Sequence, residues 1–187
     1  MGIFAEAAGW IRDLKLPDGF AVCDLGDQRM CGQFPAMKAE AFYRAIGCGH
    51  YVSIDGNGQG TVNADLNQPL DVELGTFDLV TDFGTGEHIF DQAQVWRSIH
   101  NLIRPGGYLA FDRPSQGYGK HGFYQTNVCL LEDLAAANRY KVIHLKLATT
   151  PRGRLVRGLF RVPRHAVPFV VPQQGRYQRS LRLQETG

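Results

Sequence analysis

Carboxylates recur at the ends of short apolar segments in this sequence. Asp24, Asp55 and Asp82 each follow such a segment, and each lies close to a glycine. Asp65 ends a further short segment and precedes Leu66. In an open parallel sheet, the carboxyl ends of the strands form the edge at which ligands bind. We therefore expect these side chains to line a site for a polar ligand with several hydroxyl and amino groups, as in a nucleoside.

Two of these carboxylates suit particular groups of a nucleoside. Asp55 precedes the glycine-rich stretch that begins at Gly56, and its two oxygens can accept hydrogen bonds from both ribose hydroxyls. Asp65 lies further along the chain, where it can accept a hydrogen bond from the adenine amino group. The alternative interpretation is that both residues only open turns, because Asp is common before Gly and Asn in turns.

The cysteines do not form a disulfide or metal pattern. Cys23, Cys31, Cys48 and Cys129 contain no C-x-x-C pair, and Cys23 lies in an apolar run where a small thiol packs well. The closest approach to a zinc motif is Cys48 with His50, with Cys31 upstream, which is a weak signal without a second pair. We expect four reduced thiols and no bound metal.

The rest of the pattern predicts alternating strands and helices. Helix-forming composition and apolar residues at helical spacing predict helices over residues 4–14, 35–46, 87–102 and 128–138. Apolar and β-branched runs predict seven strands, over residues 20–26, 50–55, 61–65, 77–83, 108–112, 141–147 and 154–162. Strands that alternate with helices imply crossover connections, and hence a largely parallel sheet covered on both faces.

Composition is typical of one globular domain. The chain has 187 residues, of which 44% are hydrophobic and 20% are charged. We expect a single domain over residues 1–174 and a C-terminal tail over residues 175–187, where the apolar pattern ends.

No long apolar segment predicts a signal peptide or a membrane span, which favours a cytoplasmic protein without membrane association. Arginine is concentrated within residues 152–182, which form either a solvated surface or a contact for an anionic partner.

The order of these motifs resembles that of the class I S-adenosylmethionine-dependent methyltransferases. The resemblance extends over about residues 20–162 and includes the strand that ends in Asp24, Leu25 and Gly26, the acidic strand end Asp55, and residues 63–67. Its most specific part is residues 102–109, where a helix ends at an Arg-Pro-Gly-Gly turn that leads into the next strand. The proline and the glycines of that turn stop the helix and reverse the chain.

The resemblance implies an α/β fold, namely a Rossmann-like three-layer sandwich with a mostly parallel seven-stranded sheet whose last strand is antiparallel. It also implies S-adenosylmethionine as the cofactor. The positions of this chain that correspond to the cofactor-binding segments of the family are Asp24, Gly26, Gln28, Asp55, Gly56, Asp65, Leu66, Asp82 and Phe83.

The sequence departs from the family pattern after Gly26. The family usually has a second glycine there, and often a third, so that the backbone can approach the methionine part of the cofactor. Here Asp27, Gln28 and Arg29 follow, and the next glycine is Gly32. This loop can present Gln28 to the methionine carboxylate or amine. The departure also supports an alternative function, that of a catalytically inactive methyltransferase-like subunit that binds a protein or nucleic-acid partner.

Methyl transfer to a hydroxyl needs a base, and two predicted loops supply candidates. Glu87 and His88 follow the strand that ends near Asp82, and His121 and Tyr124 lie in the loop after the fifth strand. We identify His88, His121 and Glu87 as candidate catalytic residues. The alternatives are that His88 and Glu87 serve the first turn of a helix and that aromatic residues anchor the second loop to the core. A divalent metal held by Glu87, His88 and His121 is a further alternative.

The acceptor is predicted to be an oxygen or nitrogen atom of a small molecule or sugar. The tetrapeptide that amino-methylating enzymes of nucleic-acid bases use, Asn/Asp-Pro-Pro-Tyr/Phe, is replaced by Asp82-Phe83-Gly84-Thr85. This argues against a nucleic acid, although the arginine-rich segment leaves that possibility open. The predicted elements leave no cap domain to enclose an acceptor, so a homodimer is a possible way to complete the pocket.

Overall fold

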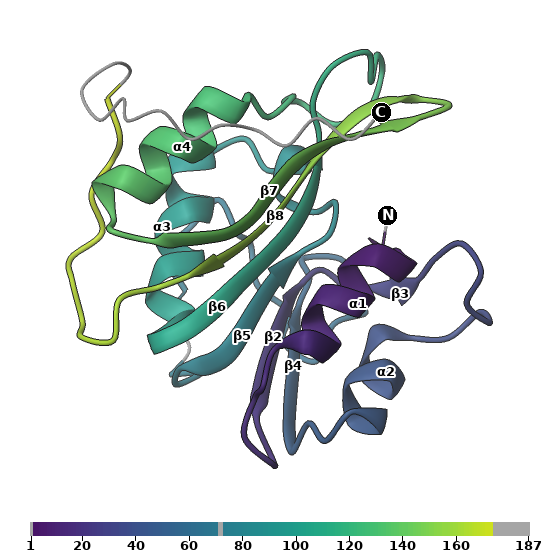
Figure 1. The fold of residues 1–187 in the computed structure, drawn as a ribbon, viewed down its shortest axis with the longest axis vertical. Helices are drawn as coiled ribbons and strands as arrows, with labels where there is room; N and C mark the ends of the chain where they lie inside the picture. Colours follow the sequence, from purple (N-terminus) through teal and green to yellow (C-terminus); the bar gives the residue numbers. More distant parts are fainter. Residues whose placement is uncertain (1, 71–72, 174–187) are drawn as a thin grey trace.

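The chain forms a central sheet with helices on both sides. The computed structural model describes residues 2–70 and 73–173. The order of strands across the six-stranded sheet is β4-β2-β5-β6-β8-β7. These strands are β2 (Ala21–Leu25), β4 (His50–Ile54), β5 (Phe77–Asp82), β6 (Ile103–Pro114), β7 (Lys141–Thr150) and β8 (Gly153–Arg161). The helices are α1 (Ala5–Asp13), α2 (Ala39–Ala45), α3 (Gln92–Leu102) and α4 (Val128–Ala137). Figure 1 shows α1 and α2 on one side of the sheet and α3 and α4 on the other.

Strand directions follow the predicted sandwich. β2, β4, β5 and β6 pair in parallel, whereas β8 is antiparallel to both β6 and β7 and lies between them. The prediction of a mostly parallel sheet with an antiparallel last strand is therefore confirmed. The strand order reverses between β2 and β5, which is the position at which open parallel sheets bind ligands.

Alternate residues of each central strand enter separate cores. Val22, Leu79 and Ala110 face the core that α1 and α2 cover, whereas Cys23 and Val80 face the core that α3 and α4 cover. All five are buried. Burial on both faces explains why these strands are continuous apolar runs in the sequence.

The predicted strand at residues 61–65 is absent from the sheet. Only one parallel bridge forms there, between Ile54 and Val62. The Thr61 hydroxyl bonds to the backbone of Ser53, at 2.7 Å from its nitrogen and 3.1 Å from its oxygen. Asp65 then accepts a hydrogen bond of 2.9 Å from the nitrogen of Asn67, which turns the chain away from the sheet edge. Within the described residues, the sheet therefore has six strands instead of the predicted seven.

Two helices begin later than their composition predicts. The helix predicted over residues 87–102 is instead a short 3-10 turn, η1 (Gly86–His88), followed by α3. Asp91 caps α3 by accepting a hydrogen bond of 2.9 Å from the nitrogen of Gln94, so the helix starts at Gln92. Likewise α2 covers residues 39–45 rather than 35–46.

A small second sheet was not predicted. β1 (Gly2–Ile3) pairs in parallel with β3 (Arg29–Met30), directly after the loop that follows Gly26. Strands of two residues carry no hydropathy period, so the sequence gives no signal for them.

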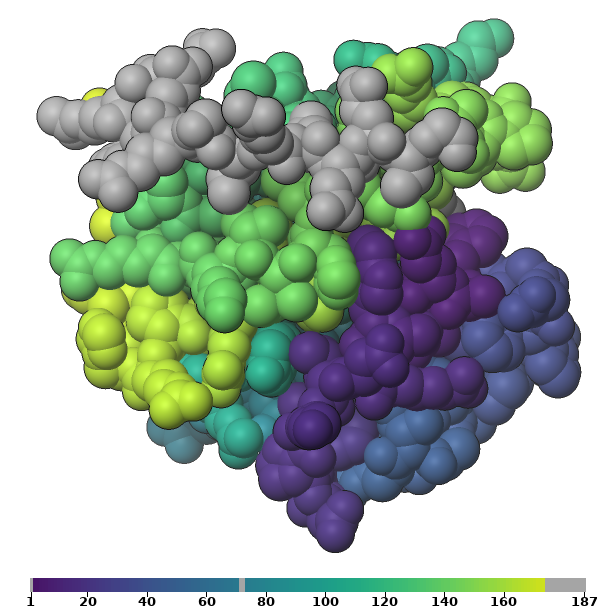
Figure 2. All heavy atoms as spheres, in the orientation of Figure 1, coloured from purple at the N-terminus to yellow at the C-terminus, as the bar shows by residue number. Residues whose placement is uncertain are grey.

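Part of the arginine-rich segment is structural. Figure 2 shows α1 in purple, lying against the green surface that includes β7. At this contact Trp10 stacks on His144 with ring centroids 4.5 Å apart, and Arg157 bonds to Asp112 at 2.5 Å and to Glu6 at 2.6 Å. Arg157 is therefore a core residue and not part of an anion-binding surface. The predicted tail, residues 175–187, lies outside the described residues.

The four cysteines are free thiols. Within residues 2–70 and 73–173, no helix has both the length and the apolar character needed to cross a membrane.

Candidate functional site

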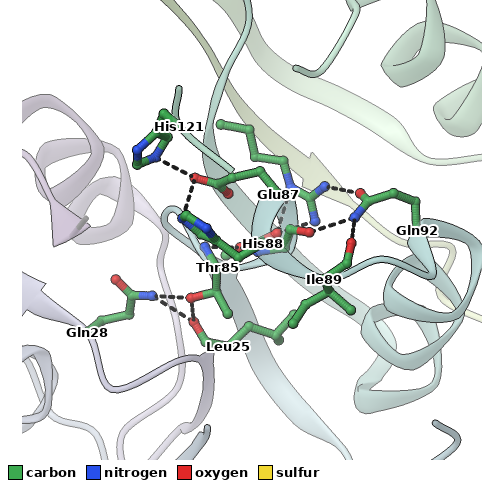
Figure 3. A network of polar contacts seen from close by, with 11 residues as sticks. Leu25, Gln28, Thr85, Glu87, His88, Ile89, Gln92 and His121 are labelled. Atoms are coloured by element: carbon green, nitrogen blue, oxygen red, sulfur yellow. Dashed lines mark hydrogen bonds and ion pairs between the residues drawn. The ribbon is translucent and has the colours of Figure 1, made fainter. Parts of the chain in front are cut away.

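Side-chain hydrogen bonds join the loops at the carboxyl ends of β4, β2 and β5. The nitrogen of Asp27, after β2, donates a hydrogen bond of 3.0 Å to Asp55 at the end of β4. On the other side, Gln28 Nε2 donates hydrogen bonds of 2.7 Å to the Leu25 oxygen and 2.9 Å to Thr85 Oγ1 (Figure 3). Loops from three neighbouring strands therefore form one connected edge at the position where the strand order reverses.

Gly26 lies beneath the Gln28–Thr85 contact. Its φ of +85° falls in the left-handed region that favours glycine. A β-carbon at this position would overlap with Thr85 Oγ1 and would lie 2.9 Å from Gln28 Nε2. Gln28 is buried, and its Oε1 has no hydrogen-bond donor among the described residues. The polar loop therefore packs against Gly26 and leaves one side-chain oxygen that can accept a hydrogen bond.

Asp55 is partly buried and has acceptor capacity left. Its Oδ2 accepts one bond from the Asp27 nitrogen, and its Oδ1 accepts one of 3.0 Å from the nitrogen of Asn57. A carboxylate oxygen has two lone pairs, so each can accept a further bond from a hydroxyl. Gly56, next to it, is exposed.

Asp65 and Leu66 differ in exposure. Asp65 is exposed, and two hydrogen bonds from Asn67 lower the pKa of its carboxyl group. Leu66 is 2% exposed and belongs to the core on the side of α3. Asn67 Oδ1 in turn accepts bonds of 3.0 Å from the nitrogens of Phe90 and Asp91, which joins this turn to the loop before α3.

The Asp24 side chain points into the protein. Its carboxyl group is fully buried and accepts hydrogen bonds from Tyr43 at 3.0 Å, from Tyr51 at 2.9 Å and from Thr81. Burial raises its pKa to about 7, and the three hydroxyl donors oppose that rise. Both carboxyl oxygens are occupied within the protein, so this side chain is not presented to a ligand at the strand ends.

Asp82 and Phe83 also have structural surroundings. Asp82 is fully buried, and its Oδ1 accepts bonds from the nitrogens of Thr85 at 3.1 Å and Gly86 at 2.9 Å. Its Oδ2 pairs with Arg113, whose Nε lies 2.6 Å away. Phe83 is buried in the core on the side of α1 and α2. Asp82 therefore fixes the loop that carries Thr85 and the 3-10 turn, rather than facing the edge itself.

The predicted catalytic residues come together. Glu87 Oε1 lies 3.3 Å from His121 Nε2 and 3.9 Å from His88 Nε2, as the dashed lines in Figure 3 show. The ligand atoms of the three side chains all lie within 4.8 Å of one another. The Glu87 carboxylate is fully buried, whereas the His121 and His88 side chains are 29% and 48% exposed. The backbone oxygen of Glu87 accepts a bond of 2.8 Å from the Phe123 nitrogen, which fixes the loop that carries His121.

The environment favours neutral forms in this cluster. Burial, together with the nearby Asp82 carboxylate, raises the pKa of Glu87 to about 7. Burial lowers the pKa of His88, and burial with the neighbouring His88 lowers the pKa of His121. Neutral imidazoles at neutral pH are suited to accept a proton or to bind a metal.

Phe90 and Phe123 lie beside the cluster and are not among the residues that the sequence singled out, whereas Tyr124 is one of its candidates. Phe90 and Phe123 are 72% and 68% exposed, and their ring centroids lie 6.1 Å apart. Tyr124 donates a hydrogen bond of 3.0 Å to the Phe90 oxygen. Exposed aromatic residues that cluster next to a polar site favour contact with a ring-shaped ligand. The sequence signal that could have identified Phe90 and Phe123 is their position in the same two loops as Glu87 and His121.

The weak zinc pattern is not assembled. Cys48 Sγ lies 3.1 Å from the His50 backbone oxygen, and the His50 ring stacks on Phe77. Among the residues that the structure describes, the group of side chains close enough to share a metal is Glu87, His88 and His121, and it contains no cysteine.

The sheet order, the inserted antiparallel β8 and the helices on both faces define the class I S-adenosylmethionine-dependent methyltransferase fold. The model of a methyltransferase domain matches residues 45–111, a segment that contains Asp55, Asp82, Glu87 and His88. The chain is therefore a class I methyltransferase-fold protein, as the resemblance implied. No curated protein is similar enough in sequence to match it.

Solved structures share this fold at low sequence identity. The 1,6-didemethyltoxoflavin N1-methyltransferase of Burkholderia thailandensis, with bound 1,6-didemethyltoxoflavin and S-adenosylhomocysteine, is 19% identical, with a TM-score of 0.60 over 85% of this chain and 77% of that one. The N-methyltransferase NodS of Bradyrhizobium japonicum, in complex with S-adenosylhomocysteine, is 15% identical, with a TM-score of 0.59 over 84% and 86%. A putative methyltransferase of Bacillus halodurans is 13% identical, with a TM-score of 0.61 over 85% and 99%.

Proposed function

We propose that this protein transfers a methyl group from S-adenosylmethionine to an oxygen or nitrogen atom of a small molecule or sugar. The fold and the methyltransferase-domain match support the class of reaction. Two similar structures contain S-adenosylhomocysteine, the product that remains after methyl transfer. The observation that carries the proposal is the connected edge of the sheet. Asp55 at one end of this edge can accept hydrogen bonds from a ribose, and Gln28 and Thr85 lie between Asp55 and the Glu87 cluster.

The residues at this edge fit parts of the cofactor. Asp55 retains acceptor capacity for the ribose hydroxyls, and exposed Asp65 suits the adenine amino group. Gln28 Oε1 lacks a donor within the described residues, and the ammonium group of the methionine part would supply one. When bound, S-adenosylmethionine supplies an electrophilic methyl group on its sulfonium.

The Glu87 cluster is suited to hold the acceptor and remove its proton. His88 and His121 have lowered pKa values, so their neutral rings can accept a proton from a hydroxyl or an ammonium group. Glu87 lies against both imidazoles and can stabilise the charge that such a transfer creates. The exposed rings of Phe90 and Phe123 would contact a ring of the acceptor.

Calorimetric titration of the full chain with S-adenosylmethionine and S-adenosylhomocysteine tests the proposal. We expect a Kd on the order of micromolar for the unchanged protein. The Kd of Asp55→Ala should be about tenfold higher or more, and a tenfold change corresponds to about 1.4 kcal/mol of binding free energy. Asp13→Ala, at the exposed end of α1, is the matched control and should bind like the unchanged protein. Thermal unfolding of each variant separates lost binding from lost folding. If the folded, unchanged protein binds neither compound, the proposal is wrong.

One observation favours a second candidate function. The side chains of Thr85 and Gln28 pack against Gly26, on the loop where family members keep open glycine backbone. A non-catalytic subunit that binds a protein or nucleic-acid partner would use the fold in this way. One solved structure with this fold is a complex between the Trm112 methyltransferase activator of Haloferax volcanii and a putative methyltransferase. Failure of the titration above, together with a stable complex between the folded chain and a different protein or a nucleic acid, would favour this candidate.

A further inference from the structure

Three potential metal ligands of complementary type meet beside the proposed acceptor. Glu87 and His88 are adjacent in the 3-10 turn after β5, and His121 enters from the loop after β6. A tetrahedral zinc site with bonds of about 2.1 Å places neighbouring ligand atoms roughly 3.4 Å apart. The separation of Glu87 Oε1 and His121 Nε2 is 3.3 Å, and that of Glu87 Oε1 and His88 Nε2 is 3.9 Å. The His88 side chain is half exposed, so a small rotation can close the longer distance.

The buried carboxylate gives an independent indication of a ligand. Glu87 is fully buried, yet its Oε2 has no hydrogen-bond partner among the described residues. A buried carboxylate oxygen without a partner is costly, because its desolvation is not compensated. A cation bound between Glu87 and the two histidines would remove this cost.

The surrounding backbone holds the ligands in place. Asp82 fixes the 3-10 turn by accepting a hydrogen bond of 2.9 Å from the Gly86 nitrogen. On the other loop, Gly122 has a φ of +66°, and a β-carbon there would lie 2.8 Å from Glu87 Cγ. The loop of His121 therefore passes directly over the Glu87 side chain, which only a glycine permits.

We propose that Glu87, His88 and His121 bind one divalent transition-metal ion of the zinc type, with at least one coordination position open toward the acceptor. Two imidazoles and one carboxylate suit zinc, iron, cobalt and nickel, whereas magnesium and calcium prefer oxygen ligands alone. With their ring nitrogens bound to the ion, His88 and His121 would no longer accept the proton themselves. The ion would instead bind an oxygen or nitrogen atom of the acceptor and lower its pKa. This role rests on the proposed function, whereas the binding of the ion rests only on these three side chains.

Cobalt titration of the untagged full chain, freed of metal with a chelator, tests the site. We expect one Co²⁺ per chain, with the visible absorption bands of low-coordinate cobalt, and displacement of Co²⁺ by Zn²⁺. Glu87→Gln and His121→Ala should weaken Co²⁺ binding about 100-fold or more, since loss of one of few ligands removes most of the affinity. His165→Ala is the matched control, because His165 is exposed and lies outside the cluster.

Two measurements separate this proposal from the proposed function. Metal is titrated without S-adenosylmethionine, and S-adenosylmethionine is titrated in the presence of chelator. Stoichiometric Co²⁺ binding that both cluster variants lose supports the metal site, even if the cofactor does not bind. If the unchanged protein does not bind Co²⁺, or if folded Glu87→Gln and His121→Ala bind Co²⁺ as tightly as the unchanged protein, the metal site is overturned. The cofactor result is unaffected in either case. Circular dichroism of each metal-free variant checks that it is folded.

Discussion

The Thr85 hydroxyl oxygen occupies the position where a side chain on Gly26 would begin. A β-carbon on Gly26 would overlap with this oxygen and would also approach Gln28 Nε2 to 2.9 Å. Two constraints therefore favour glycine at position 26, namely its φ of +85° and the side chains that pack against it. The glycine is needed for the fold of this chain as well as for any ligand at the loop.

Gly26→Ala should lower the free energy of unfolding by about 2–4 kcal/mol, the sum of backbone strain and overpacking. Gly58→Ala is the matched control, since Gly58 has a φ of +77° and open space around its α-carbon. It should cost only about 1 kcal/mol, from strain alone. Urea unfolding measures both values. Equal costs for the two variants would contradict the packing argument.

The central strands were predicted well because of how they are buried. Val22 and Cys23 face different cores, and so do Leu79 and Val80. Apolar residues are therefore favoured on both faces of the sheet. Such strands form unbroken apolar runs that a sequence pattern detects. The segment around Val62 has a similar local pattern, but only pairing with β4 decides whether it becomes a strand, and the Thr61 side chain limits that pairing.

Part of the candidate site could be predicted, because the order of the strands in the sheet determines which loops lie next to each other. Glu87 and His121 follow neighbouring strands β5 and β6, so their proximity follows from the predicted sheet. The inward direction of Asp24 does not, since its hydroxyl partner Tyr43 comes from α2. The contact between Gln28 and Thr85, which are 57 residues apart, likewise depends on packing that no local pattern encodes.

Asp24 should make the stability of the protein depend on pH. Burial raises its pKa in the folded protein to about 7, whereas in the unfolded chain the group ionises near its ordinary pKa of 3.8. Between these values the folded state holds a proton that the unfolded state lacks, so this contribution is complete below about pH 4 and is lost as the pH rises through 7. The loss is on the order of 4 kcal/mol for one group.

Asp24→Asn keeps the shape of the side chain but cannot ionise. We therefore expect it to remove this part of the pH dependence and to make the variant more stable than the unchanged protein at pH 8. Urea unfolding at intervals from pH 4 to pH 8 measures the difference between the two proteins. The other buried carboxyls, such as Asp112, are common to both and cancel. A difference that stays constant over this range would refute the raised pKa.

The Asp82–Arg113 pair should be strongly coupled. Both side chains are buried, with exposed fractions of 0% and 1%, and Arg113 also stacks on Trp96 at 4.3 Å. Arg113→Met leaves Asp82 charged and unpaired in the core, which should cost about 3–5 kcal/mol. Adding Asp82→Asn should recover part of this loss, so the double-mutant cycle in urea should give a coupling of about 1–3 kcal/mol.

Arg104→Met is the control for the Asp82–Arg113 pair. Arg104 pairs with Asp78, whose side chain is 7% exposed, but the Arg104 side chain itself is 46% exposed. Water can partly replace the Arg104 guanidinium at this open contact, so its loss should cost about 1–2 kcal/mol, less than the loss of Arg113. A coupling near zero for Asp82 and Arg113, or equal costs for the two methionine variants, would contradict the structural role assigned to the buried pair.

The exposed rings of Phe90 and Phe123 should affect the acceptor without affecting stability or the cofactor. Because both side chains are largely in solvent, Phe90→Ala and Phe123→Ala should each change the free energy of unfolding by about 0.5 kcal/mol or less. If these rings contact a ring of the acceptor, each substitution should raise the KM for that acceptor about tenfold, with S-adenosylmethionine affinity unchanged. Val171→Ala, which is also exposed but lies away from the cluster, provides the comparison. Steady-state kinetics with an acceptor found by screening, alongside cofactor titration, measures both effects. Unchanged KM values in both phenylalanine variants would place the acceptor elsewhere on the molecule, and would leave these two rings without a role in substrate recognition.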